Sequence, residues 1–238
     1  MKRLKFTKRP YLDKDIKQII IYFLIWRIGL ILISVVAPIF IPLRGRDFLG
    51  GGIENYNRTT WFFGWANFDG DHYLSIASIG YKGLEQAFFP VYPMLIKLLS
   101  LPFGNSKEIL IATGLLISNI SFLIALILLW KLTLIDYSEK VARVCILAIL
   151  AFPTSFYFGS LYNESFFLLM TVGSFYLMRK NKWFLASLIG SVASATRVFA
   201  FLLTPAFILE AWQQKVRITK FFWVILIPGG LVIYMLYQ

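Results

Sequence analysis

The sequence is poor in cysteine, in charge and above all in acidic residues. Cys145 is the only cysteine among 238 residues, which excludes an internal disulfide and a zinc site built from thiolates. Only 15% of the residues are charged, against roughly a quarter in soluble globular proteins, which excludes an ordinary soluble domain. The hydrophobic share of 58% also excludes a disordered chain, because there is ample apolar surface to bury.

The charges that are present have one dominant sign. Lys and Arg number 24 against 12 Asp and Glu, a formal net charge of +12. A chain this basic either binds nucleic acid or lies against an anionic membrane surface. The membrane is favoured, because the apolar residues come in runs close to the roughly 20 residues that a spanning helix needs. These runs are 19–43, 109–130, 144–163 and 221–238, with shorter ones at 165–178, 183–196 and 198–209.

These runs predict an all-α, polytopic membrane protein with about seven transmembrane segments, since lipid leaves the backbone no partner outside a helix. The basic residues alternate with the runs instead of forming one face, which sets nucleic-acid binding aside. Under the positive-inside rule each basic cluster lies in the cytoplasm. The protein is therefore expected in a bacterial plasma membrane or an endoplasmic reticulum membrane. The clusters are 1–18, 131–143, 179–182 and 215–220.

We treat 1–238 as one transmembrane domain with four parts. Residues 1–18 are expected to be a cytoplasmic N-terminus, and 44–86 a long extracytoplasmic loop with a catalytic role. Residues 87–103 are apolar but hold three prolines, so we expect them to be interfacial or re-entrant. Residues 107–238 are expected to form a bundle that is C-terminally incomplete, because the chain stops within an apolar run.

Two details of the apolar runs also carry expectations. Arg27 interrupts the first run within a turn or two of the basic end, so its side chain is expected to reach back to the cytoplasmic surface. In the stretch 183–211 we expect two short segments hinged at Thr196 and Arg197, with Pro205 breaking the second.

The polar residues that could take part in catalysis or ligand binding fall on the predicted outer side. Asp69, Asp71 and His72 lie within four positions of the 44–86 loop. The spacing Asp-x-Asp can hold a divalent cation beside a sugar phosphate, because such ions prefer oxygen ligands. The alternative is a solvated loop without a ligand.

Two further candidates stand between apolar runs. Glu164 either stabilises the start of the next helix or belongs to a site. Arg197 lies within an apolar stretch, where a charged side chain is costly and functional by default. A carboxylate can take a proton from an attacking hydroxyl, and a guanidinium matches the oxygens of a phosphate.

The order of these motifs resembles the PIG-V-type mannosyltransferases, the family of GPI mannosyltransferase II and its bacterial relatives within the GT-C class. The chain departs from the family at Phe68, where relatives often have Trp. The pieces that carry the resemblance lie between about residues 60 and 200, at 68–73, 76–77, 80–81, 88–93, 153–155, 162–165 and 196–197.

The resemblance implies a GT-C-like fold and a membrane glycosyltransferase. Such an enzyme moves a sugar, here expected to be mannose, from a polyprenyl-phosphate carrier to a hydroxyl of a glycolipid or glycan. Transfer would be inverting and extracytoplasmic. Asp69 matches the expected base, Asp71 and His72 would assist it, and Glu164 matches a family glutamate. Arg197 matches the residue that would hold the donor phosphate, and no metal or cofactor is expected.

Two other functions stay open at this stage. The chain could be half of a lipid or anion transporter or flippase, with Arg27 and Arg197 along the path. A transporter site should lie near the midplane of the membrane, whereas the polar candidates here gather at one rim. The chain could also be a non-catalytic subunit that acts with a partner in a glycosylation complex.

Overall fold

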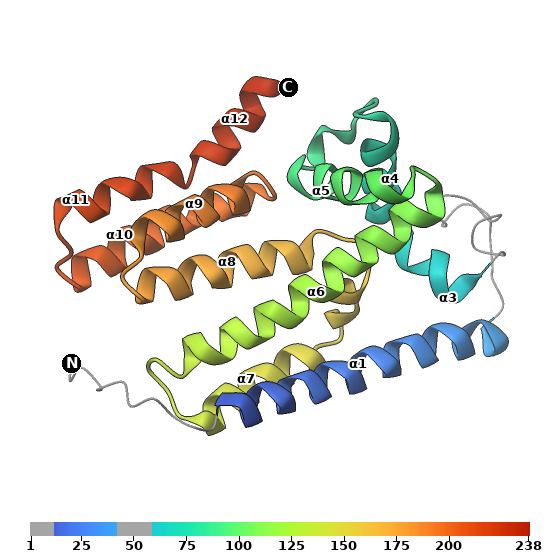
Figure 1. The fold of residues 1–238 in the computed structure, drawn as a ribbon, viewed down its shortest axis with the longest axis horizontal. Helices are drawn as coiled ribbons and strands as arrows, with labels where there is room; N and C mark the ends of the chain where they lie inside the picture. The colour runs from blue at the N-terminus through green and yellow to red at the C-terminus, as the bar shows by residue number, and fades with distance from the viewer. Residues whose placement is uncertain (1–11, 42–58) are drawn as a thin grey trace.

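The computed structural model describes residues 12–41 and 59–238. Helices and short connections make up these ranges (Figure 1), which confirms the all-α prediction. Most of the expected N-terminal segment 1–18, and the first part of the expected 44–86 loop, lie outside the described residues.

Three stretches of the described chain are long and apolar enough to cross a membrane, namely Lys14–Phe40, Lys107–Thr133 and Ile218–Tyr237. The first two lie in the continuous helices α1 (Leu12–Phe40) and α6 (Lys107–Thr133). The third joins α11 (Ile218–Phe221), the 3-10 turn η6 (Phe222–Leu226) and α12 (Gly229–Tyr237). Together with several shorter apolar helices, these spans make the protein an integral membrane protein.

The run 144–163 does not form the single spanning helix that its length predicts. Helix α7 (Glu139–Ala151) ends there, and Phe152 is extended, with φ −64° and ψ 135°. The physical reason is Pro153, whose ring disfavours a helical conformation in the residue before it. A 3-10 turn, η4 (Ser155–Gly159), follows, and the chain then enters α8 (Glu164–Arg179).

The predicted hinge near Arg197 is confirmed. Helix α9 (Trp183–Ser194) ends just before it, and Arg197 is extended, with φ −151° and ψ 140°. The 3-10 turn η5 (Val198–Leu202) then leads into α10 (Leu203–Gln213). The expected break at Pro205 was wrong, because this proline lies in the first turn of α10, where its missing N–H removes no helical hydrogen bond.

The later basic clusters meet at one end of the bundle, on the left of Figure 1, where α6, α8 and α10 end. Arg179 donates two hydrogen bonds of 2.7 Å to Asp136 and lies 3.3 Å from Glu210. Lys220 donates to the side chain of Asn181 at 3.0 Å. These contacts join the connections 131–143, 179–182 and 215–220, so the grouping expected from the charge pattern is present.

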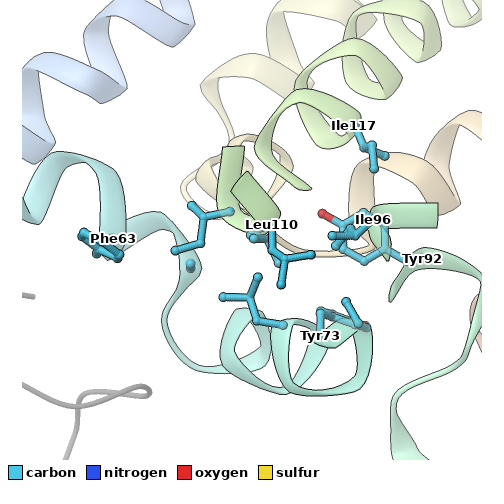
Figure 2. Packing of buried hydrophobic residues seen from close by; sticks show 11 residues of the cluster. Phe63, Tyr73, Tyr92, Ile96, Leu110 and Ile117 are labelled. Atoms are coloured by element: carbon cyan, nitrogen blue, oxygen red, sulfur yellow. The ribbon is translucent and has the colours of Figure 1, made fainter. Parts of the chain in front are cut away.

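The opposite end holds the short helices that follow α1. They are α3 (Thr60–Phe63), η1 (Gly64–Ala66), α4 (Asp69–Ile79), η2 (Glu85–Ala87), α5 (Val91–Ser100) and η3 (Leu101–Phe103). Figure 2 shows Tyr73, Tyr92, Ile96 and Leu110 packed together in the apolar core that joins α4 and α5 to α6. The segment expected to be a loop thus carries a helix, α4, held on the bundle by a buried core.

Candidate active site

Asp69 stands at the first position of α4, directly after a strained residue. Phe68 has φ 55° and ψ −120°, a conformation that a non-glycine residue keeps only where its surroundings impose it. A neighbouring segment of the same chain supplies the constraint, because the Tyr162 hydroxyl donates to the Asn67 carbonyl at 3.1 Å. The backbone N–H of Leu161 also donates to the Trp65 carbonyl at 2.8 Å. The segment before α4 is therefore tied to the segment before α8.

A third segment joins the same junction. The Asn163 side-chain amide donates to the Thr196 carbonyl at 3.0 Å, and both residues are buried. This bond places the hinge after α9 beside the start of α8. As a result, Asp69, Glu164 and Arg197, which are far apart in the sequence, lie at one junction of three segments.

The centre of this junction is an ion pair between α8 and the hinge. Arg197 Nη2 donates to Glu164 Oε1 at 2.8 Å, and the two side chains are 36% and 20% exposed. Glu164 precedes the apolar part of α8. Its burial raises the pKa of the carboxyl, an effect that Arg197 opposes and the negative charge of Asp69 reinforces. Its second oxygen, Oε2, is buried without a hydrogen-bond partner among the described residues.

Tyr73 belongs to the same site, although sequence reasoning missed it. Its side chain is 3% exposed. Its ring packs edge-on against the ring of Tyr92, with the ring centres 5.0 Å apart. Burial raises the pKa of its hydroxyl, and the nearby charge of Glu164 raises it further, so the hydroxyl stays protonated and can donate a hydrogen bond. The available signal was its spacing of four residues from Asp69, which puts both on one face of a helix.

Asp71 and His72 have other partners. A step of two residues turns about 200° around a helix axis, so Asp71 points away from the face of Asp69. Its carboxylate lies 3.9 Å from the Lys107 ammonium. His72 stacks on Phe88 and approaches Glu85, with Nδ1 3.5 Å from Oε1. The structure therefore groups Asp69 with Glu164 and Arg197 and directs Asp71 and His72 to neighbouring elements.

Glu85 is a second residue that sequence reasoning missed. Its side chain is buried, and it accepts a hydrogen bond from the Lys82 backbone N–H at 2.9 Å while facing His72. It belongs to no recognisable sequence motif, and its contact with His72 appears only when residues 80–90 fold against α4. Within the described ranges, no three His, Cys, Asp or Glu side chains are grouped as a metal site would need.

The family model described as Mannosyltransferase (PIG-V) matches residues 16–227, a range that contains all the residues of this junction. The chain belongs to the PIG-V mannosyltransferase family. It is therefore a glycosyltransferase, and both the predicted family and the predicted enzyme class are confirmed. No match was found among curated proteins or among solved structures.

In this PIG-V family member, one expectation about a charged residue was wrong. Arg27 does not reach back toward the basic end of α1. Its guanidinium carbon lies 4.5 Å from the centre of the Trp65 ring, and Trp65 belongs to the segment that leads to Asp69. The aromatic face offers the cation an attraction close by, whereas the basic end offers only hydration at the membrane surface.

Proposed function

We propose that the protein transfers mannose from a polyprenyl-phosphate carrier to a hydroxyl of a glycolipid or glycan on the extracytoplasmic side, with Asp69 as the base. The observation that carries this proposal is the junction of three segments, in which hydrogen bonds tie the segment of Asp69 to the segments that hold the Glu164–Arg197 ion pair. A base beside a phosphate-binding cation is what a sugar transfer from a phosphate carrier needs.

The proposed step is a single displacement. The acceptor oxygen attacks the anomeric carbon of mannose, and the bond from that carbon to the phosphate oxygen breaks. The electron pair leaves with the carrier phosphate, the acceptor proton passes to Asp69, and the anomeric configuration inverts. General-base assistance of this kind contributes roughly 10²- to 10⁴-fold to the rate.

Arg197 is suited to the carrier phosphate. A guanidinium has several N–H donors in one plane, and the hydrogen bond to Glu164 uses one nitrogen, Nη2. The side chain is 36% exposed, so a ligand can reach part of it. Glu164 orients the guanidinium, and the protonated Tyr73 hydroxyl is a further donor at the same junction. This division of roles assigns Asp69 to the acceptor and Arg197 to the donor.

Asp71 and His72 receive supporting roles in this proposal. Asp71 is linked to Lys107 at the start of α6, and His72 to Glu85 and Phe88, so both hold α4 in place. The extracytoplasmic location is supported by the basic connections at the far end of the bundle, which the positive-inside rule assigns to the cytoplasm.

The test compares Asp69→Asn with Asp71→Asn in the purified, reconstituted protein. The donor is polyprenyl-phosphate mannose, the acceptor is a lipid extract from the source membrane, and mannosylated products are detected by mass spectrometry. We expect Asp69→Asn to lose about 10²-fold or more of the turnover, and Asp71→Asn less than about tenfold.

Two results would reject parts of the proposal. Full turnover in Asp69→Asn would remove this residue as the base. A soluble nucleotide-linked mannose that works as well as the lipid-linked donor would remove the polyprenyl-phosphate carrier. Arg197→Lys serves as a further probe, because it keeps the charge but loses the planar fork, and it should raise the KM for the donor.

A further inference from the structure

Arg27 is a cation in the middle of an apolar helix, and the transfer mechanism above gives it no role. Charged residues inside membrane segments are costly and are functional by default. Arg27 lies within the span Lys14–Phe40, so its neighbours should reveal why a charge is held there.

Its guanidinium is enclosed by two connecting segments. The group lies over the Trp65 ring, and Nη1 is buried with no hydrogen-bond partner in the described part of the chain. Gly159 lies directly beside this nitrogen, because a Cβ at this position would overlap Arg27 Nη1 and would stand 3.2 Å from the Trp26 ring. A side chain larger than glycine at position 159 would therefore displace the guanidinium from this place.

The two contacted segments are the ones that lead into the proposed site. Trp65 lies four residues before Asp69, and Gly159 lies five residues before Glu164. The two segments also bond each other directly, through the Leu161 N–H and the Trp65 carbonyl at 2.8 Å. Arg27 thus connects the long membrane helix α1 to the two segments that precede Asp69 and Glu164.

We propose that Arg27 is a positioning residue, which holds the segments of Trp65 and Gly159 against α1 so that Asp69 and Glu164 keep their relative placement. The inference rests on the proposed function for its effect on turnover, but not for the contacts themselves. A shift of about 1 Å in a reacting group can cost about 10²-fold in rate, so loss of this contact should lower kcat.

The first experiment measures transfer by Arg27→Ala and Arg27→Lys. We expect Arg27→Ala to lower kcat about 10- to 100-fold while the KM for polyprenyl-phosphate mannose changes by less than about threefold. Arg27→Lys should recover part of kcat, because an ammonium keeps the attraction to the ring but not the flat packing. Arg217→Ala, which removes an exposed arginine at the basic end, is the matched control and should leave kcat unchanged.

The second experiment uses the glycine that faces Arg27. Gly159→Ala should lower kcat as Arg27→Ala does, because the added methyl group displaces the guanidinium. In the double variant Arg27→Ala with Gly159→Ala the overlap is gone, so the double variant should be no worse than Arg27→Ala alone. Gly29→Ala is the control for a methyl group added without a clash, because Gly29 lies on α1 with Arg27 and has open space around it.

A readout that does not depend on turnover separates this inference from the proposed function. Backbone hydrogen exchange in micelles should rise in 60–66 and in 155–163 in Arg27→Ala and in Gly159→Ala, and stay unchanged in 110–130. If Asp69→Asn keeps full activity while these exchange changes appear, the proposed base is wrong and the role of Arg27 in holding the segments stands.

Three results would overturn the inference. Unchanged exchange in both segments in Arg27→Ala would show that Arg27 does not hold them. A raised donor KM with an unchanged kcat would make Arg27 a direct ligand of the donor. Additive losses in the double variant would show that Arg27 and Gly159 act separately.

Discussion

Replacement of Arg197 should destabilise the protein more than replacement of its partner Glu164. The two side chains share one 2.8 Å contact but differ in exposure, with Glu164 20% and Arg197 36% exposed. Arg197→Met leaves a largely buried carboxylate whose Oε2 already has no partner among the described residues. Glu164→Gln leaves a guanidinium that water can reach and an amide oxygen that still accepts its hydrogen bond.

The magnitude follows from this difference in burial. Removal of one partner from a fully buried pair costs about 3–5 kcal/mol, and loss of an exposed pair costs about 0–1 kcal/mol. Since Glu164 is mostly but not fully buried, Arg197→Met should cost about 2–3 kcal/mol of the free energy of unfolding. Glu164→Gln should cost about 1 kcal/mol or less.

The pH dependence of the free energy of unfolding provides a sharper test of the same reasoning. Burial raises the pKa of Glu164 in the folded protein, and removal of Arg197 takes away an opposing influence and raises it further. A carboxyl whose folded-state pKa lies above its unfolded value binds more protons in the folded state. Its contribution to stability is therefore complete below the unfolded pKa and is lost as the pH rises through the folded pKa. The loss of unfolding free energy caused by Arg197→Met should thus be largest at neutral pH and should shrink as the medium is acidified.

The assay is reversible unfolding in detergent micelles, followed by circular dichroism for the wild type, both single variants and the double variant at a series of pH values. In the double variant the extra pH dependence should disappear, because no titrating group is left at position 164. The reasoning would be refuted if Glu164→Gln destabilised the protein as much as Arg197→Met. A deficit of Arg197→Met that stayed constant down to acidic pH would refute it as well.

Two further predictions concern the packing of the C-terminal helix α12. Gly230→Ala should cost about 2 kcal/mol or more of the free energy of unfolding, because the added Cβ would overlap the backbone carbonyl of Ser191, which cannot rotate away. Thermal unfolding checks it, with Gly29→Ala as the control that should change little. Tyr234→Phe should cost about 0.5–1.5 kcal/mol through loss of the 2.7 Å hydrogen bond to the Gln86 carbonyl. It should also speed proteolysis within 80–90, and an unchanged cleavage rate would contradict it.

Several features of the fold were predictable because they depend on local or one-dimensional properties of the chain. The run 109–130 predicts α6 by length and hydropathy alone. The grouping of the basic connections at one end follows from their alternation with apolar runs, and the hinge at Arg197 follows from a charge between two short runs. The single spanning helix predicted for 144–163 was wrong, because hydropathy does not include the conformational effect of Pro153 on Phe152.

The candidate site was predictable only in part. Asp69 stands out in the sequence through its spacing with Asp71 and His72, and Glu164 and Arg197 stand out because each lies between apolar runs. Tyr73 and Glu85 do not, since a tyrosine and a glutamate are ordinary residues until burial and neighbouring charges give them a role. Arg27 was assigned to the membrane surface because its distance along α1 is visible in the sequence, whereas the Trp65 ring over which it lies is not.

The amino-acid sequence by itself determined that this chain is a helical membrane protein, which of its ends gathers the positive charge, and which polar residues are out of place among apolar ones. These are properties of composition and order, and solvation by lipid and water acts on them segment by segment. Only the tertiary structure decided which of those polar residues meet. The junction depends on hydrogen bonds between segments about 30 to 100 positions apart, and such pairings arise from the packing of the whole bundle.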